Sequence, residues 1–190
     1  MTMDELQALV RGQDLKYFVD PDRDALLLGV RGLHASYRFV ISLQVDGTFL
    51  QFRTIDYLQC GADHPHHALV LRVLAAINVE KRLVKFAWDA SDGEIVAYAD
   101  VWLEDGTLTE RQFRRMLQNF MPTVDFAHER IRQTLESGRD PGEEGILEAL
   151  TTGASGLPPD LSALLEKLRK GESGEDEGDD AGDDEGYETI

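Results

Sequence analysis

Residues 37–45 read Tyr37-Arg38-Phe39-Val40-Ile41-Ser42-Leu43-Gln44-Val45 and place an apolar side chain at every second position. A period of two predicts a β-strand with one buried face. Asp46-Gly47 follows at once and leads into an apolar run over residues 48–55, which is the pattern of a β-hairpin with a two-residue turn. This stretch therefore predicts an antiparallel sheet at the centre of the fold.

The apolar period changes several times outside this hairpin. Four further runs have strand composition: residues 16–20, 25–31, 83–88 and 94–103. Three segments have helical spacing: residues 4–11, 68–79 and 109–135. The order helix, strands, helix, hairpin, helix (α-β-β-β-α-β-β-α) predicts an α+β fold, with an antiparallel sheet of about five to six strands and helices on one face.

The last of these helices has the clearest start signal. Thr109 and Gln112 have the spacing of a capping box, in which each side chain bonds the backbone amide of the other residue. Pro122 lies inside the apolar pattern that follows. Because proline lacks an amide hydrogen and clashes with the preceding turn, we expect it to kink the helix or split it in two.

Charge divides the chain into parts. The 190 residues contain 19 Lys and Arg against 36 Asp and Glu, for a formal net charge of -17. Residues 171–190 contain ten acidic residues and no basic one, which is -10 of that total. Their Gly, Asp and Glu composition predicts a disordered acidic tail. The compact domain is expected over 1–135, and a linker with a short helical extension over 136–170.

Composition also limits the partners and the compartment. Binding to nucleic acid or to an anionic membrane needs clustered Lys and Arg, so the acidic balance argues against both. A single cysteine, Cys60, excludes an intramolecular disulfide framework and suits a reducing cytoplasm. No run approaches the roughly 20 apolar residues that a membrane span needs. We therefore expect a cytoplasmic protein.

Several segments of the chain resemble the YbjN family, whose members are described as bacterial sensory transduction regulators. The resemblance lies in Leu74-Ala75-Ala76-Ile77-Asn78, in Lys85-Phe86-Ala87-Trp88-Asp89 with the following Asp92-Gly93-Glu94-Ile95, and in Leu108-Thr109 before the last helix. It covers residues 4–135. It implies a fold like that of type III secretion chaperones and a dimeric, non-enzymatic protein of the bacterial cytoplasm that binds another protein. It brings no catalytic residue and no cofactor.

The segment 68–79 has more apolar side chains than one face of a sheet can cover. A second subunit or the extension at 157–170 would bury the surplus, and the resemblance favours a homodimer. Partner contacts are expected from apolar and aromatic side chains. The candidates are Phe49, Trp88, Tyr98, Trp102, Leu71 and Leu74, with Tyr187 and Ile190 at the end of the tail.

Two alternatives compete with a protein-binding function. His64, His66 and His67, with Cys60 nearby, have side chains that bind zinc, so the chain could be a small metal-dependent enzyme or a metal-binding protein. Ligands so close in sequence rarely surround one ion, and the plainer interpretation is a helix start with Pro65 in its first turn. The second alternative is that the acidic tail imitates a nucleic acid.

Overall fold

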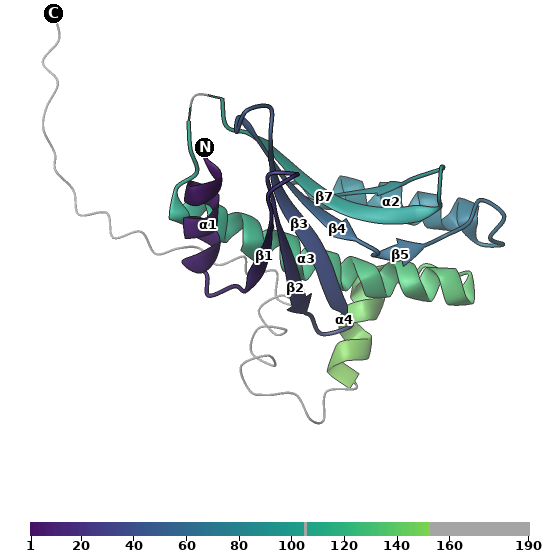
Figure 1. Ribbon diagram of the computed structural model, residues 1–190. Helices are drawn as coiled ribbons and strands as arrows, with labels where there is room; N and C mark the ends of the chain where they lie inside the picture. The colour runs from purple at the N-terminus through teal and green to yellow at the C-terminus, as the bar shows by residue number, and fades with distance from the viewer. Residues whose placement is uncertain (105, 153–190) are drawn as a thin grey trace, which may run out of the picture. The chain divides into compact units, whose positions relative to one another are not determined.

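A computed structural model of the chain describes residues 1–104 and 106–152 (Figure 1). Contacts divide the chain into Met1–Ile146 and Leu147–Ile190, and the fold below is that of the first unit. The extension expected at 157–170 and the acidic tail with Tyr187 and Ile190 lie outside the described residues.

An antiparallel sheet of seven strands forms the centre of the fold. The strands are β1 (Tyr17–Asp20), β2 (Ala25–Arg31), β3 (Ser36–Gln44), β4 (Phe49–Ile55), β5 (Leu58–Gln59), β6 (Lys85–Trp88) and β7 (Glu94–Trp102). Their order is β1-β2-β3-β4-β7-β5, and β6 pairs with the other edge of β7. The α+β class and the antiparallel sheet are thus confirmed. The sheet has one strand more than the five to six that were expected, and this additional strand is the two-residue β5.

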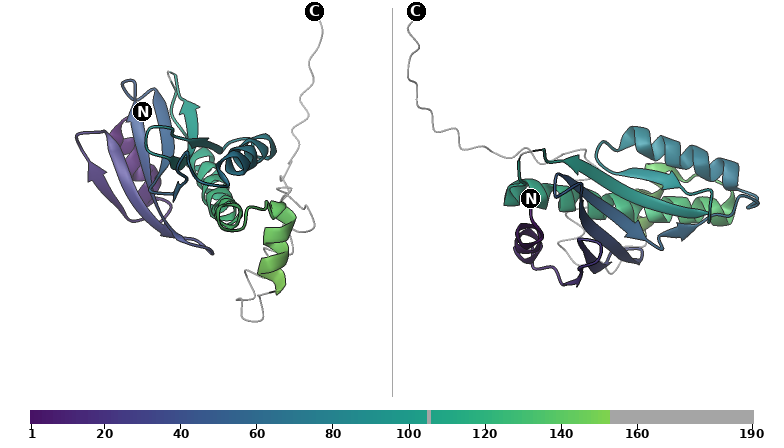
Figure 2. Two further views of the ribbon diagram at one scale, coloured as in Figure 1. Left: turned by 90° about the vertical axis from the view of Figure 1, so that its right-hand side faces the viewer. Right: turned by 45° about the horizontal axis from the view of Figure 1, so that its top comes forward.

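Four helices accompany the sheet: α1 (Met3–Arg11), α2 (His67–Glu80), α3 (Glu110–Ser137) and α4 (Gly142–Thr152). In the left view of Figure 2, α2 and α3 lie on the same side of the strands. Phe52 of β4 packs its ring against Phe113 and Phe120 of α3, with ring centroids 5.8 and 5.7 Å apart. Buried side chains of α1 and α2, such as Leu6 and Val73, belong to the same core. No helix in the described part of the chain is long and apolar enough to cross a membrane.

The connection between β3 and β4 is longer than the predicted two-residue turn: Gln44 lies opposite Phe49, so residues 45–48 form the loop. Val45 and Asp46 have φ angles of 51° and 54°, and the amide of Gly47 donates to the carbonyl of Gln44 at 3.1 Å. Gly47 also has a positive φ, and a Cβ there would lie 2.1 Å from the backbone oxygen of Met1. The glycine is therefore needed for its close approach to the N-terminus, while Val45 and Asp46 occupy the left-handed turn positions.

Helix α3 is continuous through Pro122, so the split that the proline suggested is wrong. The capping box of Thr109 and Gln112 begins the helix as expected, and Gly138 ends it with a φ of 67°. Buried side chains lie both before and after the proline, including Phe113 and Ile131. Burial along the whole length offsets the one lost hydrogen bond, because packing of the apolar face supplies most of a helix's stability.

Candidate protein-binding surface

The face of the sheet that points away from the helices carries exposed apolar and aromatic side chains. Side chains alternate between the two faces of a strand, so the neighbours of the core residues Phe39 and Phe52 point outwards. We call this side the outer face. It comprises Phe18, Leu27, Val40, Phe49, Gln51, Arg53, Tyr98, Asp100 and Trp102. The buried side chains of α1, α2 and α3 belong to the core, which lies on the opposite face of the sheet.

An aromatic pair forms one end of the outer face. Phe49 of β4 lies opposite Trp102 of β7 in the strand register, and their ring centroids are 4.8 Å apart. Trp102 is 62% exposed, although tryptophan is usually well buried. Next to this pair, Gln51 donates a hydrogen bond of 2.9 Å to the carboxylate of Asp100. A large exposed aromatic side chain beside polar groups is typical of protein-contact surfaces.

Phe18 lies at the opposite edge of the outer face. Its side chain is 81% exposed, and its strand neighbour Leu27 is half-buried. Tyr98, one of the residues expected to contact a partner, lies on β7 opposite Arg53 of β4 and is half-buried. Aromatic side chains on this face therefore come from β1, β4 and β7.

The other residues expected to contact a partner lie elsewhere. Trp88 of β6 is half-buried, and its Nε1 donates a hydrogen bond of 2.8 Å to the carbonyl of Cys60. On α2, Leu71 is 36% exposed, whereas Leu74 is 4% exposed and belongs to the core. Within residues 1–104 and 106–152, only the outer face brings several of the expected aromatic residues together.

The histidine segment before α2 does not converge on one point. The rings of His64 and His66 are 5.6 Å apart, and the amide of His66 donates to Nδ1 of His64. His67 instead packs against Trp88, with a centroid distance of 4.4 Å. Cys60 is buried, which raises the pKa of its thiol. Among the described residues, no group of three or more His, Cys, Asp or Glu could hold a metal ion.

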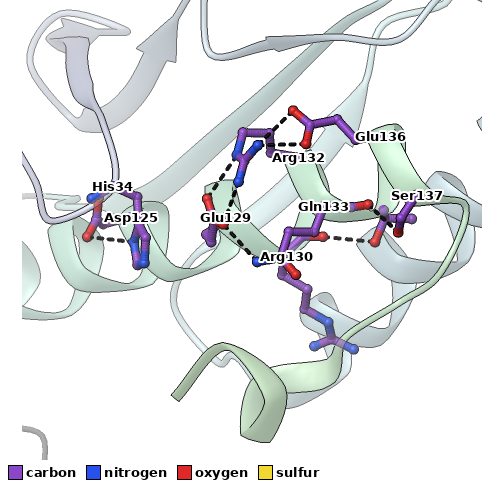
Figure 3. Close-up of polar contacts among 9 residues, drawn as sticks. His34, Asp125, Glu129, Arg130, Arg132, Gln133, Glu136 and Ser137 are labelled. Carbon is purple, nitrogen blue, oxygen red and sulfur yellow. Dashed lines mark hydrogen bonds and ion pairs between the residues drawn. The ribbon is translucent and has the colours of Figure 1, made fainter. Parts of the chain in front are cut away.

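A second cluster, which the sequence patterns did not reveal, surrounds Asp125 of α3 (Figure 3). Its carboxylate accepts hydrogen bonds from the amides of Leu33 and His34, at 2.9 and 3.0 Å, and from the Tyr37 hydroxyl at 2.6 Å. The ring of His34 lies 3.2 Å from the same carboxylate. Gly32 allows this approach, because a Cβ there would lie 2.2 Å from a carboxylate oxygen of Asp125.

The charges of this cluster follow from these contacts. Burial alone would raise the pKa of Asp125, but hydrogen bonds from His34, Tyr37 and the backbone outweigh it and lower the pKa to about 2. The hydrogen bond to Asp125 raises the pKa of His34 despite burial, and burial together with Asp125 raises that of Tyr37. The side chains hydrogen-bonded to Asp125 are an imidazole and a phenol. The contacts of Asp125 with Leu33, His34 and Tyr37 hold the β2–β3 loop on α3, and we call this group the clamp.

Two further aromatic contacts extend the clamp into the core. The Tyr57 hydroxyl donates a hydrogen bond of 2.6 Å to the carbonyl of Val124. The ring of His128 lies 5.4 Å from the rings of both Tyr37 and Tyr57. Its Nδ1 is buried without a hydrogen-bond partner in the described structure, and burial lowers the pKa of His128. Desolvation therefore favours a neutral imidazole at this position.

Ion pairs tie the end of α3 to neighbouring segments. Arg130, which is 7% exposed, pairs with Glu80 of α2 at 2.9 Å and with Asp140 at 2.8 Å. Arg132 pairs with Glu129 and Glu136 on its own helix, as Figure 3 shows. The buried guanidinium of Arg130 therefore joins α3 to α2 and to the segment that contains Asp140.

A family model described as "Putative bacterial sensory transduction regulator", that of YbjN, matches residues 2–133. The chain belongs to the YbjN family. The match ends at residue 133, within α3, so it covers α1, α2, the sheet, the outer face and the Asp125 cluster. None of the curated proteins matches the chain.

A solved structure of another YbjN protein has the same fold. The crystal structure of YbjN from E. coli has a TM-score of 0.55 and 16% identity, over 72% of this YbjN-family chain and 93% of the other. The structure of the HopA1–SchA chaperone–effector complex has a TM-score of 0.48 and 14% identity, over 65% and 90% of the respective chains.

Proposed function

We propose that the protein is a non-enzymatic binding module of the bacterial cytoplasm, with a regulatory or chaperone-like role, and that its outer face contacts a protein partner. The observation that carries this proposal is the Phe49–Trp102 pair, with Trp102 62% exposed. Aromatic anchors of this kind supply most of the binding energy in many protein interfaces. The regulator description of the family supports the same role.

The proposal is tested with a variant that removes the aromatic pair. The double variant Phe49→Ala/Trp102→Ala should lose capture of a specific partner from native lysate of the source bacterium, because both anchors are gone. Val79→Ala is the matched control, since Val79 is 86% exposed but lies on α2. Equal capture of the same protein by all three forms would reject the outer face as the contact.

A fluorescence measurement separates direct contact from an indirect effect. The chain has two tryptophans, so Trp88→Phe leaves Trp102 as the only tryptophan emitter. Partner binding on the outer face should shift the Trp102 emission to shorter wavelength, because the exposed indole would leave water. An unchanged spectrum on saturation with the captured partner would place the contact elsewhere.

The metal centre and the nucleic-acid mimic have less structural support than the protein-binding function. A metal centre at His64, His66 and His67 has no geometric basis, because their rings do not converge in the described structure. The nucleic-acid mimic rests on the tail, which lies outside the described residues. The homodimer remains a proposal. Val70, Val73, Leu74 and Ile77 of α2 are buried within the chain itself, so a different interface is argued below.

A further inference from the structure

The two edges of the sheet differ in how their backbone groups are covered. At the β6 edge, the side-chain amide of Asn78 from α2 bonds both backbone groups of Phe86: it accepts from the amide at 2.7 Å and donates to the carbonyl at 2.9 Å. The ammonium of Lys85 is held nearby by the carbonyls of Asn78 and Lys81. A helix thus closes this edge against further strands, which is a common protection for exposed edges.

The β1 edge has no such cover among the described residues. β1 ends the strand order, and it pairs only with β2. Phe18 is 81% exposed and Val19 47% exposed. An unpaired edge strand offers a row of amide and carbonyl groups to another strand.

Hydrogen bonds elsewhere in the sheet show which β1 groups face outwards. Leu43 donates to the carbonyl of Asp24, and Gly32 donates to that of Ala35. In the β2–β3 register, both bonds join directly opposite residues, and the β2 member of each pair has an even number. Backbone groups alternate in direction along a strand, so the amides and carbonyls of even-numbered β2 residues face β3 and those of odd-numbered residues face β1. In the β1–β2 register Ala25 lies opposite Asp20, so the even residues of β1 face β2. The amides and carbonyls of Tyr17 and Val19 therefore point to the free edge.

We propose that β1 is the interface for a second copy of this chain, in an antiparallel pair whose two-fold axis passes between the two Phe18 residues. In this register Tyr17 lies opposite the partner's Val19, and each pair exchanges two backbone hydrogen bonds. Phe18 then lies at a non-hydrogen-bonded position, where opposing side chains approach most closely. Both Phe18 rings project from the outer face, so the two outer faces become one continuous surface.

Charge favours the same register. Lys16 lies opposite the partner's Asp20, so two opposite-charge pairs flank the aromatic pair symmetrically. The Asp20 carboxylate accepts a hydrogen bond of 3.2 Å from the amide of Asp22, and its distance to the 83% exposed Arg23 side chain is 3.8 Å. A register shifted two residues towards Asp22 would place Phe18 opposite Asp20 and lose the aromatic pair. The sequence of β1 is thus self-complementary about Phe18.

Light scattering on the full chain gives the first test. The paired segment is short, so we expect a concentration-dependent dimer with a dissociation constant in the micromolar range, about 10–100 µM. The measured mass should approach twice the chain mass at several hundred micromolar. A constant monomer mass across this range would overturn the proposal and leave the edge to a strand of another protein.

Cysteine cross-linking tests the position of the two-fold axis. In a Cys60→Ser background, Phe18→Cys places two thiols opposite each other, and mild oxidation with copper phenanthroline should give a disulfide-linked dimer. Val19→Cys is the matched control, because the register places Val19 opposite Tyr17 rather than itself. Equal cross-linking of the two variants would overturn the register.

Charge reversal separates this interface from any other dimer contact. Lys16→Asp and Asp20→Lys should each weaken dimerisation about tenfold, because two like-charge pairs replace two opposite-charge pairs. The double variant Lys16→Asp/Asp20→Lys should restore the parent affinity. Failure of the double variant to recover, with an unchanged circular dichroism spectrum, would overturn the pairing. None of these outcomes depends on capture of a partner by the outer face.

Discussion

The hydroxyl of Tyr37 on β3 donates a hydrogen bond of 2.6 Å to the carboxylate of Asp125 on α3, 88 positions further along the chain. Tyr37 is 7% exposed and Asp125 is 5% exposed, so water competes little for this bond. The same carboxylate holds the amides of Leu33 and His34. One buried charge therefore joins the central sheet, the β2–β3 loop and the long helix, and its removal should be felt through the whole domain.

Asp125→Asn should destabilise the domain by about 3 kcal/mol, because the new amide group would face donors where a carboxylate accepted their hydrogen bonds. Urea denaturation followed by circular dichroism measures the change. Asp22→Asn, in an exposed turn, is the control and should change stability by less than about 0.5 kcal/mol. A loss of similar size in both variants would contradict the clamp.

Acid titration should reveal the low pKa of Asp125. A folded pKa of about 2, below the ordinary 3.8, means that the carboxylate stabilises the fold above about pH 4. This contribution of about 2 kcal/mol should disappear as the pH falls through the folded pKa. The stability gap between the parent and Asp125→Asn should therefore narrow from about pH 4 towards pH 2. A gap that stays constant over this range would show that the carboxylate titrates normally.

His34 should give the opposite pH dependence. Its pKa is raised by the hydrogen bond to Asp125, so the protonated ring stabilises the fold below its ordinary pKa of 6.5. This stabilisation is lost as the pH rises through the folded pKa. The destabilisation by His34→Gln, measured by urea denaturation, should be larger at about pH 5.5 than at about pH 8.5. An equal effect at both pH values would mean that the imidazole contributes only as a neutral group.

Local patterns predicted the elements that depend on neighbours in sequence. The alternation from Tyr37 to Val45 predicted β3, and the capping box of Thr109 and Gln112 predicted the start of α3. Each of these patterns is formed by residues that lie within a few positions of one another. The antiparallel sheet and the helical face could therefore be predicted before any tertiary contact was known.

Contacts between distant segments could not be predicted in the same way. Asp125 looks like an ordinary polar residue in a helix, and its partners come from a loop about 90 positions earlier. Asn78 is a second example: it lies within α2, and its side chain accepts a hydrogen bond from the amide of Phe86 on β6. An available clue was that Asp125 follows Val124 on the apolar stripe of the helix, where a charge needs buried partners.

Val45→Asn should stabilise the domain by about 1 kcal/mol, because Val45 has a φ of 51° that β-branched side chains adopt with strain and asparagine tolerates. The Val45 side chain is 60% exposed, so little burial is lost. Thermal denaturation measures the gain. Val79→Asn is the control: Val79 is also exposed but lies in α2 with a helical backbone, so it should show no gain. A similar rise in both variants would point to surface polarity instead of backbone strain.

Asn78→Ala should both destabilise the domain and open the second edge of the sheet. The variant loses the two hydrogen bonds that the side chain makes to Phe86, at a cost of about 2 kcal/mol. The freed amide and carbonyl of Phe86 then lie at an unprotected strand edge, where another chain can pair. Light scattering should therefore detect species larger than the parent forms under the same conditions. Asn119→Ala is the control, because Asn119 bonds only a carbonyl of its own helix at an exposed position. If Asn78→Ala is destabilised but its mass distribution matches that of the parent, the side chain contributes stability alone, and other parts of α2 protect the β6 edge.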